Sequence, residues 1–156
     1  LVISWLRARR IVDEVIRSRS CDEVLYIPRF APWRDHLYNM EQEPQYGFKE
    51  KALYAITYDN SRKQYAAIAV SVSKGSFENR LPFPSAWRGL RHQELESACG
   101  VKGAVFVHAS GFLGCNATKE GIVEMVKKSI ELQLNKTIAL DPSKMVDAEV
   151  LLAKQQ

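Results

Sequence analysis

A glycine-rich turn is the first feature of the sequence that suggests contact with a ligand. It runs from His108 to Gly114 and contains Ser110 and Gly111. Backbone N–H groups in such a turn can face an anion, and a helix following the turn would add its dipole. The imidazole of His108 would supply a hydrogen bond or a positive charge to a phosphate. The spacing fits neither a P-loop nor a nucleophile elbow. A phosphate-contacting turn and a purely structural turn around a buried histidine both remain open.

The segment from Lys74 to Arg91 interleaves arginines with aromatic residues. They are Arg80, Arg88 and Arg91, and Phe77, Phe83 and Trp87. Guanidinium groups bind phosphates through paired hydrogen bonds, and aromatic rings stack on unpaired bases. The alternative is a loop whose aromatic rings cover the core while its arginines pair with Glu78, Glu94 or Glu96.

Residues that could hold a metal or act as a nucleophile are scattered along the sequence. His36, His92 and His108 lie far apart, and no H-E-x-x-H motif occurs. With neither a metal cluster nor a nucleophile arrangement, the chain has no visible means of cutting a bond by itself. We therefore expect the chain alone to be inactive.

The composition is that of an ordinary globular domain. The chain has 156 residues, 46% of them hydrophobic and 26% charged, with a formal net charge of +4. This length suits one domain with a sizeable core. The three cysteines, none at C-x-x-C spacing, argue against a disulfide framework or zinc ribbon and favour a reducing compartment. No apolar run approaches the roughly 20 residues of a membrane helix. The mild positive charge permits a nucleic-acid partner without requiring one.

The apolar pattern predicts an α+β fold in which helices cover a mixed or antiparallel sheet. The expected elements are a helix over residues 1–19, a strand over Val24–Pro28, a helix over Trp33–Gln42, a hairpin of Leu53–Asp59 and Gln64–Ser73, a long loop over Lys74–Gly89, a helix over Leu90–Cys99, a strand over Ala104–His108, a turn over Ala109–Cys115, a helix over Lys119–Leu134 and a short amphipathic helix in the tail from Asp141. The second hairpin strand is apolar on both faces, which predicts a central place in the sheet. Thr118 is positioned to cap the helix after it.

The first helix is rich in arginine and has no cap before Leu1, so we expect the chain to be part of a longer protein. Its apolar residues, including Trp5, Ala8 and Val12, recur at spacings of three and four. This spacing predicts a stripe that faces the core, with the arginines on a solvated face. Unspecific RNA binding by these arginines is the alternative.

Three stretches together resemble the motifs of one family. Pro32–Leu37 resembles P-W-[KR]-x-H-L, Phe77–Arg91 resembles F-x-[SN]-R-x-P-x-P-x-x-W-R-G-L-R, and Phe106–Phe112 resembles F-V-H-A-S-G-F, followed by a T-[KR]-E-G helix start at Thr118–Gly121. From Leu1 to Leu134 the chain is similar to the C-terminal half of the Myg exonuclease family. This is the melanocyte proliferating gene family, formerly labelled metal-dependent protein hydrolase.

The resemblance implies the lobe of a larger enzyme. The family resembles DHH-type phosphoesterases, and its members are 3′–5′ exonucleases that act on RNA in the nucleus and mitochondria. Residues 1–140 would form the substrate-binding C-terminal lobe, and residues 141–156 a tail. A divalent metal, Mn²⁺ or Mg²⁺, would be bound by the N-terminal half, with no ligand and no catalytic residue from this chain. The expected partners are single-stranded RNA, the N-terminal lobe of the same protein and a second copy in a homodimer, with no membrane.

The resemblance also ranks the site residues. Arg80 is the first candidate for binding phosphate, His108, Ser110 and Gly111 follow, and Arg88 and Arg91 come last. The alternative function is a non-catalytic interaction or dimerisation module. It would dock through its tryptophans, which are Trp5, Trp33 and Trp87.

Overall fold

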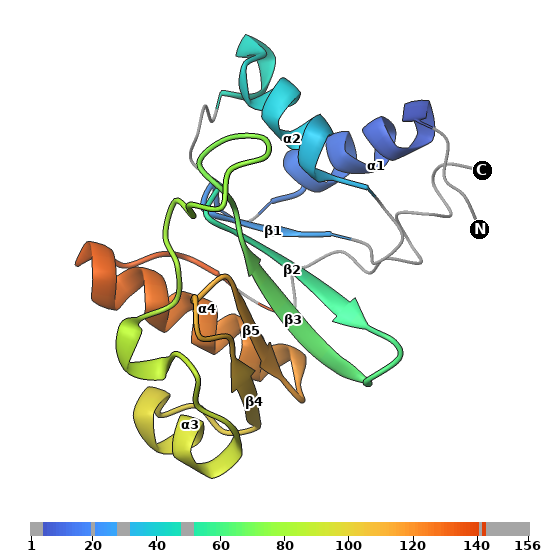
Figure 1. Ribbon diagram of the computed structural model, residues 1–156. Coiled ribbons are helices and arrows are strands. Elements are labelled where there is room, and N and C mark those ends of the chain that lie inside the picture. The colour runs from blue at the N-terminus through green and yellow to red at the C-terminus, as the bar shows by residue number, and fades with distance from the viewer. Residues whose placement is uncertain (1–4, 20, 28–31, 48–51, 141, 143–156) are drawn as a thin grey trace.

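A five-stranded mixed sheet with helices on both faces forms the framework of the chain (Figure 1). The computed structural model describes residues 5–19, 21–27, 32–47, 52–140 and 142. Its elements are α1 (Trp5–Arg17), β1 (Val24–Tyr26), α2 (Arg34–Glu41), β2 (Tyr54–Asp59), β3 (Gln64–Ala69), α3 (His92–Cys99), β4 (Ala104–Val107), β5 (Leu113–Asn116) and α4 (Lys119–Leu134), with short 3₁₀ turns at Pro44–Tyr46 and Ser85–Trp87. The α+β prediction is confirmed.

The sheet has the strand order β1-β2-β3-β5-β4. Only β1 and β2 are parallel, and the other neighbours are antiparallel. The predicted central place of β3 is therefore confirmed. Ala67 and Ala69 suit this place because they pack into the hydrophobic cluster on the face that α4 covers.

β5 corrects the sequence prediction of a turn over residues 109–115. The strand Leu113–Asn116 lies between β3 and β4 and pairs with both. Its Gly114 and Asn116 have low strand propensity, so the local sequence gives no strand signal. Close packing selects the glycine: a Cβ on Gly114 would lie 2.9 Å from the buried ring of Phe83. Tertiary pairing, rather than local preference, makes this segment a strand.

One hydrophobic cluster lies between the sheet and the helices α3 and α4. The core face of α4 consists of Ile122, Val123, Val126 and Ile130, which are all buried. The predicted cap is also confirmed: the Gly121 N–H donates to the Thr118 hydroxyl over 3.0 Å.

A second cluster lies on the opposite face, where α1 and α2 cover β1 and β2. The predicted stripe of α1 is correct for Ala8, Val12 and Val15, which are buried. Trp5 is an exception, since 64% of it is exposed and its ring meets only the edge of the His36 ring, 5.0 Å away. The adjacent half of this face, over β3, β5 and β4, has no helix above it in the described residues (Figure 1).

The long segment between β3 and α3 is held both by backbone hydrogen bonds and by side chains. Phe83 and Trp87 lie in the cluster beneath α4, as predicted. Phe77 is fully exposed, so it does not cover the core as expected. The predicted tail helix after Asp141 lies outside the described residues. Within the described ranges, no helix is both long and apolar enough to cross a membrane.

Candidate nucleotide-binding site

The turn from His108 to Gly111 joins β4 to β5 as a tight hairpin. The Ser110 N–H donates to His108 Nδ1 over 3.0 Å, and the Gly111 N–H donates to the His108 carbonyl over 2.8 Å. These N–H groups are used within the turn. Because β5 follows the turn, the helix dipole expected from the sequence does not act there. This corrects the prediction of a turn leading directly into a helix.

The ring of His108 is oriented by its own turn. The Ser110 hydroxyl lies 2.9 Å from Nδ1, and the ring edge packs on Phe112 with centroids 4.6 Å apart. Because the Ser110 N–H donates to Nδ1, neutral His108 carries its proton on Nε2. Nε2 has no hydrogen-bond partner in the part of the chain described here, so this nitrogen is left to serve as a donor.

Arg88 lies beneath the turn and helps to shape it. Its Nε donates to the Phe83 carbonyl over 2.8 Å. A Cβ on Gly111 would lie 2.6 Å from this Nε, and the Gly111 backbone has φ of +77°. Glycine is therefore needed at position 111 for both its conformation and the close approach of Arg88.

Arg80 forms a buried ion pair with α2. Its Nη1 and Nη2 donate to the two carboxylate oxygens of Glu41, both over 2.8 Å, and Nη1 also donates to the Ala52 carbonyl over 2.9 Å. The side chains of Arg80 and Glu41 are only 9% and 1% exposed. Such paired hydrogen bonds are the same kind that would hold a phosphate. The guanidinium thus ties the long segment to α2, and its predicted phosphate role stays a prediction.

Arg91 lies apart from the turn, at the start of α3. Its guanidinium stacks over the Phe106 ring at 4.5 Å, and its side chain is exposed. Arg80 and Arg91 therefore lie in different places. Arg80 is in the buried ion pair with Glu41, and Arg91 is at the exposed start of α3. Among the described residues, none of the three arginines forms an ion pair with Glu78, Glu94 or Glu96, so the alternative of loop ion pairs does not hold there.

The three motif stretches meet at one hollow of about 460 Å³, called here the motif hollow. It is lined by Arg34, Ile68, Ala69, Ser71, Ser76, Phe77, Asn79, Ser110 and Phe112. Arg34 comes from the first motif, Phe77 and Asn79 from the second, and Ser110 and Phe112 from the third. The hollow thus combines one guanidinium, several hydroxyl and amide groups and two exposed aromatic rings.

Arg34 is the site residue that the sequence reasoning missed. It lies in the first turn of α2, is exposed, and holds its guanidinium 4.7 Å above the Trp33 ring. The signal was present, because the motif accepts only Lys or Arg at this position. Asn79 was also passed over because it stands beside Arg80.

A metal centre finds no support among these residues. In the described ranges, no three His, Cys, Asp or Glu side chains come together to hold an ion. The donor set of the described residues therefore does not fit a divalent metal.

A family model described as an uncharacterised protein family, MYG1 exonuclease (UPF0160), matches residues 1–130. The chain belongs to the MYG1 exonuclease family. It is 39% identical over 133 residues to a MYG1 protein of Schizosaccharomyces pombe, and 35% identical over 133 residues to the MYG1 exonuclease of Homo sapiens. A MYG1 protein of Dictyostelium discoideum is 37% identical over 131 residues. Family membership supports a nuclease-type function.

The MYG1 relatives are considerably longer than the region they share with this chain. The alignments cover 85%, 81% and 81% of the chain, but only 40%, 34% and 39% of the S. pombe, human and Dictyostelium proteins. No solved structure matches the chain.

Proposed function

We propose that this chain is the substrate-binding lobe of a MYG1-type exonuclease and holds a single-stranded nucleic acid in the motif hollow. One observation carries the proposal: three family motifs that are separate in sequence line one hollow. The residue types there suit a nucleotide. A guanidinium binds phosphate, amide and hydroxyl groups bind base edges or ribose, and aromatic rings stack on bases.

Within the hollow, Arg34 is the phosphate-binding group of this proposal. It is exposed and lies over the Trp33 ring, and no carboxylate among the described residues pairs with it. Asn79 and Ser110 supply hydrogen bonds, and Phe77 and Phe112 supply stacking surfaces. His108 supports Phe112 from the side and has Nε2–H as a further donor.

The wider activity is extended from the family. The full-length protein would hydrolyse RNA from its 3′ end, in the nucleus or mitochondria. A Mn²⁺ or Mg²⁺ ion would be held by the N-terminal half of such a protein and would supply an activated water. This lobe would position the phosphate by binding alone, with no catalytic group of its own.

Fluorescence anisotropy of a labelled eight-nucleotide RNA tests the proposal. We expect Arg34→Gln to weaken binding and to reduce the slope of log affinity against log salt by about 0.7, the value for one phosphate contact on a single strand. Arg10→Gln is the matched control, because Arg10 is an exposed arginine on α1 away from the motif hollow. Equal binding by the two variants, or no binding by the parent chain, would refute the role of the motif hollow.

The alternative interaction module has one observation in its favour. Trp5 and Leu6 at the start of α1 are 64% and 52% exposed, and exposed aromatic residues favour protein interfaces. Trp33 and Trp87, the other two proposed docking residues, are instead buried at 7% and 2% exposure. Sedimentation of the chain with and without Trp5→Ser separates this alternative. A dimer that the substitution dissociates would support docking through α1.

A further inference from the structure

A second hollow occupies the uncovered half of the sheet, on the face that carries α1 and α2. It measures about 790 Å³ and is called here the sheet hollow. Its lining is Thr57, Tyr58, Asp59, Asn60, Ser61, Arg62, Gln64, Ala66, Arg91, Val105, Phe106, Leu113 and Cys115. Strand register explains its floor, because Ala66 is opposite Thr57 on one side and Cys115 on the other, and Cys115 is opposite Phe106. Cross-strand partners point to one face, so a single row of Thr57, Ala66, Cys115 and Phe106 crosses four strands, with small side chains in its middle.

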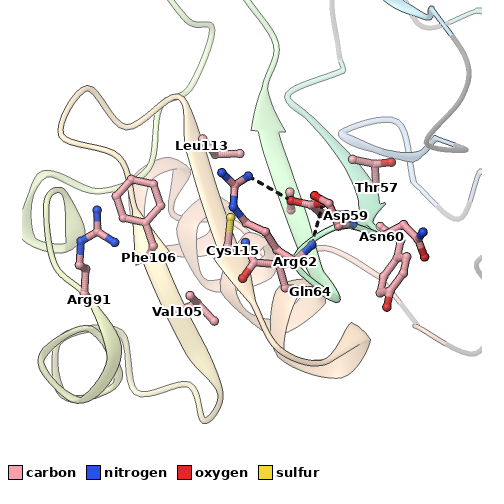
Figure 2. Close-up of a pocket in the computed structure, with 13 residues that line it drawn as sticks. Thr57, Asp59, Asn60, Arg62, Gln64, Arg91, Val105, Phe106, Leu113 and Cys115 are labelled. Atoms are coloured by element: carbon pink, nitrogen blue, oxygen red, sulfur yellow. Dashed lines mark hydrogen bonds and ion pairs between the residues drawn. The ribbon is translucent and has the colours of Figure 1, made fainter.

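The two sides of the sheet hollow carry positive charge (Figure 2). On one side, Arg91 stacks over the Phe106 ring at 4.5 Å. On the other, the β2–β3 turn presents Arg62, whose side chain is 75% exposed. Asp59 is the acidic residue in the lining, and it is already paired with Arg62 at 3.3 Å and accepts a hydrogen bond from the Ser61 hydroxyl. With Arg62 paired to Asp59, the lining keeps one uncompensated positive charge, that of Arg91, and this charge favours an anionic occupant.

Polar groups without partners among the described residues also line the sheet hollow. The Thr57 hydroxyl is buried and has no hydrogen-bond partner in the described part of the chain. Among the same residues, no hydrogen bond engages the side-chain amides of Asn60 and Gln64. A buried hydroxyl without a partner is costly, and a ligand that bonds to it would remove that cost. Amides and hydroxyls beside an arginine stacked on a ring are groups that read and stack unpaired bases.

The sheet hollow adjoins the motif hollow on the same face. Ile68 lines the motif hollow, Leu113 lines the sheet hollow, and the two residues are direct partners in the β3–β5 pair. Neighbouring strands lie about 4.8 Å apart, so no element separates the two hollows at this point. A single-stranded nucleic acid bound in one hollow would reach the other hollow along the face of the sheet.

We infer that the sheet hollow binds a further nucleotide of the strand held in the motif hollow, with its phosphate between Arg62 and Arg91. The occupant is single-stranded nucleic acid that crosses β5 and β3. This inference rests on the proposed function, because it extends the same strand. The inference places Arg91 in the sheet hollow, away from the turn of His108. It also gives Arg62 a role that no sequence motif indicated.

Binding of RNA oligonucleotides of different lengths tests the inference. The probes are uridine 5′-monophosphate and labelled uridine oligomers of two, four and eight nucleotides, titrated into the 156-residue chain. For the parent we expect affinity to rise between the mononucleotide and the tetranucleotide, by about 10-fold or more for each added stacked base. For Arg62→Gln/Arg91→Gln we expect most of this rise to be lost, and the salt slope of the octamer to fall by about 0.7, the value for the one phosphate that the two arginines share. Mononucleotide binding should fall less than octamer binding, because uridine 5′-monophosphate can also occupy the motif hollow.

Lys102→Gln/Lys127→Gln is the matched control. It removes the same charge from residues that line neither hollow, and Lys127 lies on α4 at the opposite face. If both double variants lower affinity equally, general charge explains the effect and the inference is wrong. The inference also fails if the arginine variant binds every oligomer like the parent, or if it changes only the self-association of the chain, which would mark a protein interface.

The same series separates the two proposals. If Arg34→Gln weakens the mononucleotide while the arginine double variant leaves the length dependence intact, the motif hollow stands and the sheet hollow is excluded. If the parent chain binds no oligomer, both are excluded together.

Discussion

The Arg80–Glu41 pair allows a sharp test of what Arg80 does. Glu41→Gln keeps the shape of the side chain and removes its charge, which leaves a buried guanidinium without its counter-ion. The pair is two-pronged, with both contacts at 2.8 Å and exposures of 9% and 1%. Removing one partner of a buried pair costs about 3–5 kcal/mol. With a urea m-value of about 2 kcal/mol/M, the unfolding midpoint should fall by about 2 M.

A double-mutant cycle isolates the pair from its surroundings. Arg80→Met should cost a similar amount, because it leaves the Glu41 carboxylate buried. Glu41→Met/Arg80→Met should be far more stable than the sum of the two single losses predicts, since apolar pairs often replace buried ion pairs with little loss. The remaining loss would come from the Ala52 carbonyl, about 1 kcal/mol. We expect a coupling energy of at least about 2 kcal/mol.

Urea unfolding followed by circular dichroism, with RNA anisotropy on the same samples, reads both roles. If Glu41→Gln unfolds at the parent's midpoint, the pair does not hold the segment and our reading of Arg80 is wrong. If Arg80→Met loses RNA binding while keeping its stability, Arg80 contacts phosphate, as the family resemblance implies.

Other substitutions test the turn, the core and the floor of the sheet. Gly111→Ala should lower the free energy of unfolding by about 1–3 kcal/mol, because the backbone φ is +77° and the added Cβ would contact Arg88. Gly89→Ala should cost less, because Gly89 has φ of +78° but open space around it. Equal losses in urea would exclude the contact. Burial lowers the pKa of His36 below 6.5, so on acidification the unfolded chain takes up the proton before the folded chain does. Stability should therefore fall as the pH drops through and below 6.5. His36→Gln should flatten this dependence in thermal melts, and an unchanged profile would contradict the prediction. Burial raises the pKa of the Cys115 thiol to about 11, so half-buried Cys21 should react with a disulfide reagent before Cys115 does. Mass spectrometry reads the order of reaction, and the reverse order would contradict a closed floor of the sheet hollow.

The sequence predicts the elements well where local signals and tertiary packing agree. Thr118 begins α4 because its hydroxyl caps the helix, and Gly100 ends α3 because its backbone φ is positive. β5 was missed because its residues are chosen by contact with Phe83 and by two neighbouring strands, and such contacts leave no periodic pattern. Phe77 was misplaced for a related reason: an aromatic residue in a loop has the same local pattern whether it is buried or exposed.

The candidate site was harder to predict than the fold. The motifs could be recognised one by one, but their meeting at one hollow depends on long-range folding. The family resemblance ranks Arg80 first for binding phosphate, yet its partner Glu41 lies 39 residues earlier in the chain. Arg34 has the same chemistry and an exposed position, which only the structure reveals. The type of residue thus predicted phosphate binding, and burial decides which arginine is available to bind a phosphate.

The segment between β3 and α3 joins the two hydrophobic clusters that the sheet separates. Arg80 is fastened to α2 on one face, and three residues later Phe83 lies in the cluster beneath α4 on the other. Neither cluster can open without straining this connection, so both should melt in one cooperative transition. The amides of Arg80 and Phe83 donate to Val70 and Gly111 outside any helix or strand. Their hydrogen exchange with solvent should be as slow as that of the central strand.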